Sequence, residues 1–161
     1  MDRIDDIDAQ ILDLLQARGR MKRSRIAEEV GLSLPSVSDR MRKLEDRGVI
    51  TGYHAVVDPK RLHLDITAFI RVTVDRSSNF DDFVCRAIQL EEVQEVHSVT
   101  GDGSHMLRVC TKNTTSLERL LSCIQSWPGV HGTSTSIVLT SFKDTRAINA
   151  EPVDLVEEVL A

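Results

Sequence analysis

The chain has 161 residues, of which 41% are hydrophobic, 28% are charged and 4% are aromatic, and its formal net charge is −5. This composition can bury a core in one large domain or two small ones, which excludes a wholly disordered chain. It offers few aromatic rings for stacking single-stranded bases, and no apolar run approaches the roughly 20 residues of a membrane span.

The N-terminus and the cysteines indicate a cytoplasmic protein. Residues 1–6 are acidic and lack the apolar segment of a signal peptide. The three cysteines, Cys85, Cys110 and Cys123, form no Cys-x-x-Cys pair, which argues against a disulfide framework or a zinc ribbon and is typical of a reducing compartment. We therefore expect a cytoplasmic location and no membrane partner.

The net charge conceals an uneven distribution along the sequence. From Arg18 to Arg47 nine basic residues stand against five acidic ones, a balance of +4, whereas residues 65–161 have eight basic and fourteen acidic residues, a balance of −6. A basic block near one end of an acidic chain indicates two domains with different partners. A merely solvated surface is the alternative, so the split alone does not identify nucleic acid as the partner.

The first predicted helix lies near the N-terminus. Apolar residues recur there three and four positions apart, at Ile4, Ile7, Ile11, Leu14 and Leu15. Asp5 or Asp6 can cap its start, and Gly19 marks its end.

Two further short helices are predicted before residue 50. Ser24 can cap the second, which ends at Gly31. The third runs from about Leu34 to Arg47, with Ser33 as its N-cap, and it ends at Gly48. The tight glycine-containing turn between the second and third helices is typical of a helix-turn-helix.

The pattern becomes alternating after Gly48. Val49–Val57 predicts one or two short strands, either a wing or a linker, closed by the Asp58-Pro59 turn. Strand and helix patterns then alternate over Ile66–Val74, Phe80–Leu90 (capped by Ser78 or Asn79), Val93–Thr100, His105–Thr111, Thr115–Trp127 and Val130–Phe142. This βαββαβ order predicts a ferredoxin-like domain. A small helix is expected over Glu151–Ala161.

These elements predict an α+β protein with four parts. Residues 1–50 form a winged-helix-like helix-turn-helix domain, and residues 51–64 form a strand linker. Residues 65–142 form the ferredoxin-like effector and oligomerisation domain, and residues 143–161 form a C-terminal tail with a short helix.

The outward face of the third helix has side chains that suit DNA. With 100° per residue, Val37, Met41 and Leu44 point inward and the polar and basic residues point outward. With the basic stretch before it, this helix supplies the expected DNA contacts Arg25, Ser36, Ser38, Arg40, Arg42, Lys43 and Arg47.

These contacts fall into two groups. Side chains near the start of a recognition helix usually approach the bases, which favours Ser36, Ser38 and Arg40 as base contacts. The later residues Arg42, Lys43 and Arg47 suit the phosphate backbone better. An ordinary solvated helix face is the alternative, but the tight turn and the basic stretch from Arg18 to Arg25 favour DNA.

Seven short segments of the chain carry a resemblance to a known family. They are Ile4–Leu12, Gly31–Arg40, Arg42–Glu45, Gly48–Tyr53, Leu90–Glu95, Val99–Asp102 and Pro128–Val130. In this order they resemble the Lrp/AsnC family, also called feast/famine regulatory proteins, over about residues 2–142. The resemblance implies a helix-turn-helix joined by a strand to a ferredoxin-like regulatory domain. That domain is expected to form a homodimer, often an octamer, and to bind amino acids or related metabolites between subunits.

The turn after Thr100 matches the ligand loop of that family. Members with an amino-acid effector tend to have glycine, an acid, an aromatic residue, aspartate and tyrosine there, and the matching candidate effector-binding residues are Gly101, Asp102, Gly103, Ser104 and His105. The aspartate, which would suit an α-ammonium group, is replaced by Ser104. Three alternatives stay open: an amino-acid effector, another metabolite held by backbone N–H groups and Ser104, or a turn without a ligand.

Metal binding and catalysis find little support. His97, His105 and Cys110 are possible ligands for zinc, nickel or copper, but two surface histidines around a turn lack tight ligand spacing, so no metal site or cofactor is expected. Asp102, Ser104 and His105 are triad residue types, yet hairpin neighbours cannot point as nucleophile, base and orienter. No phosphate loop or dinucleotide fingerprint is present, so an enzyme is not expected.

The sequence therefore predicts a sequence-specific DNA-binding transcriptional regulator. A symmetric dimer would present two recognition helices to a pseudo-palindromic site in double-stranded DNA. The alternative is a metabolite-binding oligomerisation module whose N-terminal helices mediate only protein contacts. The concentration of Arg and Lys on and before the third helix favours DNA, and a steep salt dependence of binding would distinguish the two.

Overall fold

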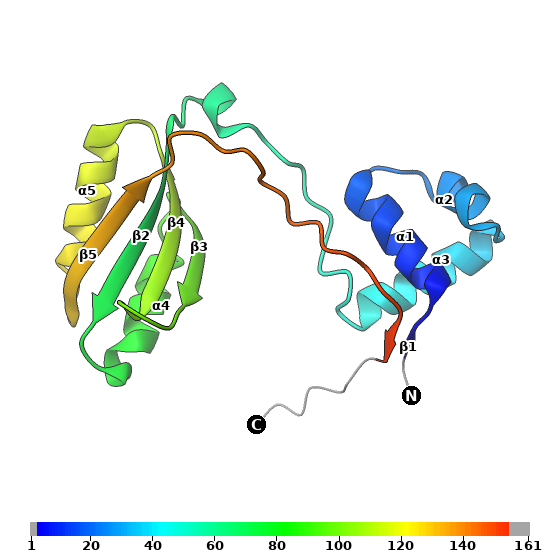
Figure 1. The fold of residues 1–161 in the computed structure, drawn as a ribbon, viewed down its shortest axis with the longest axis horizontal. Coiled ribbons are helices and arrows are strands. Elements are labelled where there is room, and N and C mark those ends of the chain that lie inside the picture. The colour runs from blue at the N-terminus through cyan, green and yellow to red at the C-terminus, as the bar shows by residue number, and fades with distance from the viewer. Residues whose placement is uncertain (1–2, 155–161) are drawn as a thin grey trace. The chain divides into compact units, whose positions relative to one another are not determined.

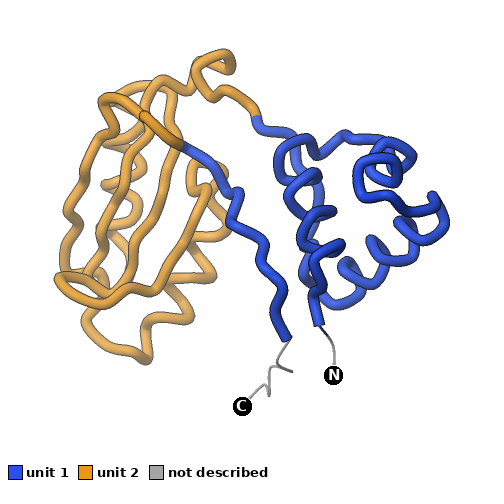
Figure 2. The backbone as a smooth tube through the Cα atoms, turned by 45° about the vertical axis from the view of Figure 1, so that its right-hand side comes forward, with its two compact units in different colours: residues 1–56, 144–161 blue, residues 57–143 orange. Residues whose placement is uncertain are grey.

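The computed structural model describes residues 3–154 (Figure 1), and the chain divides into two compact units (Figure 2). The first unit combines residues 1–56 with residues 144–161, of which 3–56 and 144–154 are described, and the second unit is residues 57–143. Every helix in the described residues is too short or too polar to cross a lipid bilayer.

The first unit contains the helices α1 (Asp6–Ala17), α2 (Arg23–Val30) and α3 (Leu34–Asp46). The predicted aspartate cap of α1 and serine cap of α3 are confirmed: the Asp5 side chain accepts from the Asp8 N–H at 2.8 Å, and Ser33 accepts from the Ser36 N–H at 3.3 Å. Gly31 ends α2 with a φ of 68°, which is the left-handed conformation that glycine adopts at low cost. These signals produce the helix-turn-helix predicted from the sequence.

The start of α2 differs from the expectation. Ser24 is not its cap; the cap position is Lys22, which makes no side-chain capping bond, and Ser24 lies inside the first turn. The helix therefore begins earlier than the serine signal indicates. Its first backbone N–H groups lack a side-chain acceptor from the cap residue, and no acidic residue stands in the first turn.

The core of the first unit joins the inner faces of all of these helices. Its buried residues are Ile11, Leu15, Ile26, Ala27, Val37, Met41 and Leu44. The apolar spacing in the sequence predicts this core, because residues three and four apart share one face of a helix.

The tail after residue 143 packs with the first unit. Strand β1 (Arg3–Ile4) pairs antiparallel with β6 (Val153–Asp154). The Gln16 side chain donates to the carbonyl of Ile148 at 2.9 Å and accepts from its N–H at 2.8 Å. The helix expected over Glu151–Ala161 is wrong for residues 151–154, which hold β6, and residues 155–161 lie outside the described residues.

The strands expected over Val49–Val57 are also wrong. These residues form no strand, and the segment continues into the short 3-10 helix η1 (Pro59–Leu62). Val49 and Ile50 pack against the core of the first unit, but Val56 is fully exposed, so the alternating pattern does not form one continuous buried face. A strand needs a second strand beside it for its backbone hydrogen bonds, and within the described residues no strand pairs with this segment.

The second unit is built on a four-stranded antiparallel sheet in the order β3-β4-β2-β5. The strands are β2 (Ile66–Val74), β3 (Val93–Ser98), β4 (His105–Thr111) and β5 (Val130–Ile137). Helices α4 (Phe80–Ala87), preceded by the short 3-10 helix η2 (Ser77–Asn79), and α5 (Thr114–Gln125) complete it. Strand order and connections confirm the predicted ferredoxin-like plan.

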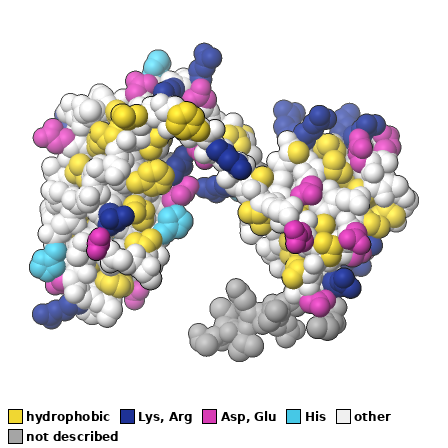
Figure 3. All heavy atoms as spheres, in the orientation of Figure 1, with side chains coloured by type: hydrophobic (Ala, Val, Ile, Leu, Met, Phe, Trp, Pro, Cys, Tyr) yellow, Lys and Arg dark blue, Asp and Glu magenta, His cyan; other side chains and the backbone are white. Residues whose placement is uncertain are grey.

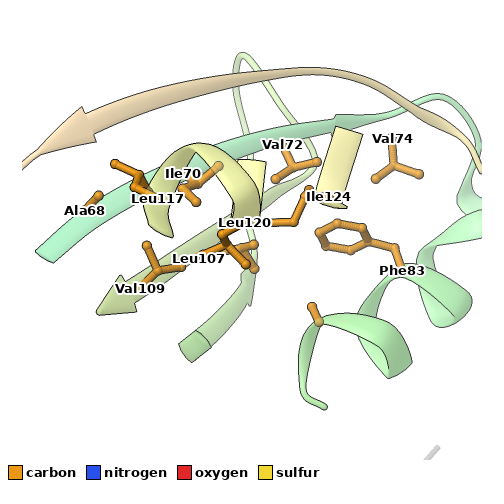
Figure 4. Close-up of a cluster of buried hydrophobic side chains, with 11 residues drawn as sticks. Ala68, Ile70, Val72, Val74, Phe83, Leu107, Val109, Leu117, Leu120 and Ile124 are labelled. Carbon is orange, nitrogen blue, oxygen red and sulfur yellow. The ribbon is translucent and has the colours of Figure 1, made fainter. Parts of the chain in front are cut away.

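Both helices cover the same face of the sheet. Alternate residues of β2 from Ala68 to Val74 are buried against Phe83 of α4 and against Leu120 and Ile124 of α5 (Figure 4). The period of two in the strands and of 3.6 in the helices predicts this core.

Several elements of the second unit end earlier than the sequence predicts: α4 ends at Ala87 instead of Leu90, and β3 ends at Ser98 instead of Thr100. Strand β5 ends at Ile137 instead of Phe142, and Leu139 and Phe142 are 90% and 96% exposed. The cap of α4 is Asn79, but its side chain donates to Asp75 at 2.8 Å instead of capping the helix.

Candidate nucleic-acid interface and effector turn

Helix α3 has the two faces predicted from its sequence. Val37, Met41 and Leu44 are buried with at most 4% exposure, whereas Ser36 and Arg42 are exposed. The outward face therefore consists of polar and charged groups that a groove of DNA could contact.

Arg40 does not point freely outward as expected. Its Nη1 lies 2.7 Å from Asp5 Oδ2 and 2.7 Å from Asp8 Oδ1, and its side chain is 29% exposed. Burial raises the pKa of Asp5, but the Asp8 N–H and the Arg40 guanidinium outweigh it and lower that pKa. Arg40 thus connects α3 to the capping box of α1.

The other charged residues of α3 form a local network. Asp39 accepts from Arg42 Nη2 at 2.6 Å and lies 2.8 Å from Lys43 Nζ. Arg42 Nη1 also lies 3.4 Å from Asp46 Oδ2. Hydrogen bonds from Lys43 and Arg42 lower the pKa of Asp39, which favours the charged form of this carboxylate.

A basic surface lies at the connection between α1 and α2 (Figure 3). A cleft of about 390 Å³ there is lined by Arg18, Arg20, Met21, Lys22 and Arg25. Arg25 is engaged by Glu28 and Glu29 at 2.8 Å and 2.7 Å. Arg18, Arg20 and Lys22 form no ion pair within residues 3–154, so their charges are available to a partner.

The effector turn joins β3 to β4, with Gly101 and Asp102 exposed. Gly103 has a φ of 148°, and a Cβ atom there would lie 2.7 Å from Cγ of Arg71. Position 103 therefore accepts only glycine as long as the Arg71 side chain has the conformation seen in the structure. The Arg71 side chain fills the space that a side chain at position 103 would need.

Ser104 is used inside the protein. Its Oγ accepts from the Val74 N–H at 3.0 Å and lies 3.3 Å from the carbonyl oxygen of Val72. The serine therefore ties the turn to the end of β2. Of the side chains in the turn, Asp102 is the exposed carboxylate that a ligand can reach.

His105 is a core residue, so its expected surface position is wrong. It is 1% exposed, its ring centroid lies 4.8 Å from that of Phe80 and 4.7 Å from that of Phe83, and its Nδ1 lies 2.8 Å from Ser104 Oγ. Burial lowers its pKa. Among the described residues, no three His, Cys, Asp or Glu side chains gather as metal ligands would.

Comparison with known proteins connects both units to one family. The model of the Lrp/AsnC ligand binding domain matches residues 67–148, and a winged helix-turn-helix DNA-binding model matches residues 4–51. The chain is 37% identical over 145 residues to the HTH-type transcriptional regulator LrpA of Mycobacterium tuberculosis, covering 90% of the chain and 97% of that relative.

The chain belongs to the Lrp/AsnC family.

Two further relatives agree. The HTH-type transcriptional regulator FL11 of Pyrococcus abyssi is 34% identical over 142 residues, which are 88% of this chain and 93% of that protein. The feast or famine regulatory protein of M. tuberculosis, solved with L-methionine, has a TM-score of 0.85 and 36% identity, covering 90% and 98% of the two chains. This Lrp/AsnC protein is thus a helix-turn-helix transcriptional regulator, which favours DNA binding over a module confined to protein contacts. Its relatives are regulators and not enzymes.

The sequence contains a local signal for the buried position of His105. His105 stands two and four residues before Leu107 and Val109, and this alternation places it on the buried face of β4. No comparable local signal pairs Arg40 with Asp5 and Asp8, because 35 and 32 residues separate the partners.

We expect the second unit of this Lrp/AsnC regulator to lose stability in mild acid through His105. Its lowered pKa means that the unfolded chain takes up a proton below the ordinary value of 6.5 before the folded protein does. The contribution of neutral, buried His105 to the free energy of unfolding is therefore complete above pH 6.5. It is lost as the pH falls toward the lowered pKa of His105. Urea unfolding at pH 7.5 and pH 5.5 measures this, and His105→Gln should remove the difference.

His97→Gln is the matched control, because His97 is an exposed imidazole on the neighbouring strand β3. An equal loss of stability between the two pH values in His105→Gln and in the unmodified protein would contradict the assignment.

Proposed function

We propose that this regulator binds double-stranded DNA through the outward face of α3 and through the basic surface at the α1–α2 connection. The observation that carries the proposal is the set Arg18, Arg20 and Lys22, which adjoins the helix-turn-helix and has no ion pair within the described residues. Unpaired cations at the start of a helix-turn-helix suit phosphate groups, because no internal salt bridge must break on binding.

The contacts predicted from the sequence divide into two roles. Ser36 and Ser38, in the first half of α3, suit base edges, while Arg25, Arg42, Lys43 and Arg47 suit the phosphate backbone. Arg40 instead supports the interface by holding α3 against the start of α1. The affinity for random-sequence DNA should fall with rising salt by about 0.9 log units per log unit of salt for each phosphate contact.

Binding curves at several salt concentrations test this proposal. A steep negative slope of log affinity against log salt supports direct DNA binding. Salt-independent association, or none, would leave the helix-turn-helix as a protein-contact module.

We further propose that the regulator acts as a homodimer, with larger assemblies such as octamers built from it. Phe69 lies on the sheet face that the two helices leave open and is 41% exposed. Leu139 and Phe142, which follow β5, are almost fully exposed. Apolar side chains of this kind are typical of subunit interfaces. Light scattering after size exclusion measures the assembly directly.

A symmetric dimer would meet a pseudo-palindromic DNA site, since two identical recognition helices present the same residues in both halves. We place the protein in the cytoplasm, where a transcriptional regulator of this family would meet genomic DNA.

The effector we propose is an amino acid or a closely related metabolite bound at the turn Gly101–His105. The likeness to the M. tuberculosis protein solved with L-methionine supports an amino acid. Asp102 is the exposed carboxylate of the turn and suits an α-ammonium group. Arg71, whose side-chain carbons lie beside Gly103, is a cation that suits a carboxylate. Ser104 and His105 shape the turn from within.

A thermal-shift series over the twenty amino acids tests the effector. The active one should raise the melting temperature by the equivalent of roughly 2.7 kcal/mol at 100 times its dissociation constant. Asp102→Asn should remove the shift, while Glu118→Gln, which removes one exposed charge on α5, should retain it. A turn that holds no ligand would give no shift with any amino acid.

A further inference from the structure

Within α3 the formal charges balance, because Arg40, Arg42 and Lys43 stand against Asp39, Glu45 and Asp46. Asp39 and Asp46 carry two negative charges, and Arg42 and Lys43 carry two positive ones, all within two turns of the helix and linked by ion pairs. Arg40 is held by two further carboxylates. The attraction to phosphates therefore does not come from a surplus of positive charge on this helix. The presence of acidic residues on a helix that faces DNA needs an explanation of its own.

Asp39 occupies the part of α3 that base edges would meet. It follows Ser36 by three residues and precedes Arg42 by three, so all three side chains share one face of the helix. The Asp39 side chain is 45% exposed, and its carboxylate has no contact with the apolar core that would explain it structurally.

A carboxylate close to DNA is unfavourable unless its charge is balanced and its oxygens find donors. Arg42 and Lys43 provide the balance, one on each carboxylate oxygen. Each carboxylate oxygen has two lone pairs, so each retains one acceptor site after binding a cation. The geometry thus leaves Asp39 as a charge-balanced acceptor of hydrogen bonds on the surface of α3.

Only two groups in the major groove can donate to such an acceptor: the N4 amine of cytosine and the N6 amine of adenine. In adenine the acceptor N7 stands next to the amine and would repel a carboxylate, whereas cytosine has no acceptor beside N4 in the groove. We propose that Asp39 is a specificity-determining residue that accepts a hydrogen bond from the N4 amine of a cytosine in each half-site. This inference rests on the proposed DNA binding through α3.

Selection of binding sites from randomised DNA tests the proposal. The unmodified protein should select a cytosine at one fixed position in each half-site, preferred about ten-fold over the other bases. Asp39→Asn should change that preference to adenine, because an amide can donate to N7 and accept from N6 at once. Preferences at the other positions should stay as they are.

Asp46→Asn is the matched control. It removes one carboxylate that also contacts Arg42, but it lies two turns after Asp39, toward the end of the helix. It should raise the affinity for all sequences and leave the selected cytosine unchanged. The same cytosine selected by Asp39→Asn and by the unmodified protein would overturn the proposal.

A change in the DNA alone provides a test that does not depend on the folding of a variant. Replacing the selected cytosine by 2-pyrimidinone removes the 4-amino group, and we expect the affinity of the unmodified protein to fall about ten-fold. Unchanged affinity for this DNA would also overturn the assignment of Asp39. If the unmodified protein selects no sequence and binds no DNA, the proposed function fails at the preceding step.

Discussion

Replacing Arg18, Arg20 and Lys22 together by alanine is expected to weaken DNA binding by roughly 100-fold at moderate salt and to flatten its salt dependence. These side chains have no ion pair within the described residues, so their full charge is available to phosphates. The slope of log affinity against log salt should become less steep by about 0.9 for each phosphate that is no longer neutralised. Binding curves between low and moderate salt, on one fixed DNA duplex, give both quantities.

Two controls separate this prediction from a general reduction of positive charge. Arg25→Ala should have a smaller effect, because Glu28 and Glu29 already engage that guanidinium. Substituting Arg42 and Lys43 by alanine should also cost less than the triple substitution, since both are paired with Asp39. A larger effect from either control would show that the α1–α2 connection is not the principal region that binds phosphates.

The helix-turn-helix could be predicted because its signals are local. Asp5 and Ser33 cap helices within three residues of the N–H groups that they bind, and Gly31 provides the left-handed residue that ends α2. Ser24 is the same residue type as Ser33 but lies inside the first turn of its helix. A serine near the start of a helix therefore predicts that a helix is present better than it predicts at which residue the helix begins.

Strands at the edges of the units were predicted less well, for a physical reason. The alternation in Val49–Val57 specifies side-chain faces, but a strand also requires a partner for its backbone groups. Conversely, Val153–Asp154 has no strong strand pattern and becomes β6 because Arg3–Ile4 lies beside it. Pairing between distant segments is not encoded in the periodicity of either segment.

The candidate site shows the same limit. A helical wheel correctly places Val37 and Met41 inside and Arg42 outside, since these positions depend on α3 alone. It cannot show that Arg40 contacts the start of α1, which depends on how two helices pack. Sequence reasoning therefore identified the candidate DNA-facing element but not the role of each cation on it.

Arg40→Ala is expected to destabilise the first unit by roughly 2–3 kcal/mol, because hydrogen bonds to charged groups are the strong ones and a buried carboxylate would lose its cation. Asp8 is the carboxylate that is most affected by the loss of Arg40, because its side chain is only 11% exposed to solvent. In a unit of this size the change corresponds to a melting temperature lower by about 10 °C. Arg42→Ala, which removes an arginine paired with exposed carboxylates on the same helix, should cost under about 0.5 kcal/mol.

The pH dependence distinguishes this structural role from a role in base recognition. Because the pKa of Asp5 is lowered in the folded protein, the charged carboxylate contributes fully to the free energy of unfolding above pH 3.8, the ordinary pKa of the group. That contribution is lost as the pH falls through the lowered pKa. The difference in unfolding free energy between the unmodified protein and Arg40→Ala should therefore narrow below about pH 3.8. If Arg40→Ala instead melts like the unmodified protein and only relaxes the base preference, Arg40 leaves Asp5 and Asp8 to contact DNA, and the sequence-based assignment of a base contact is the correct one.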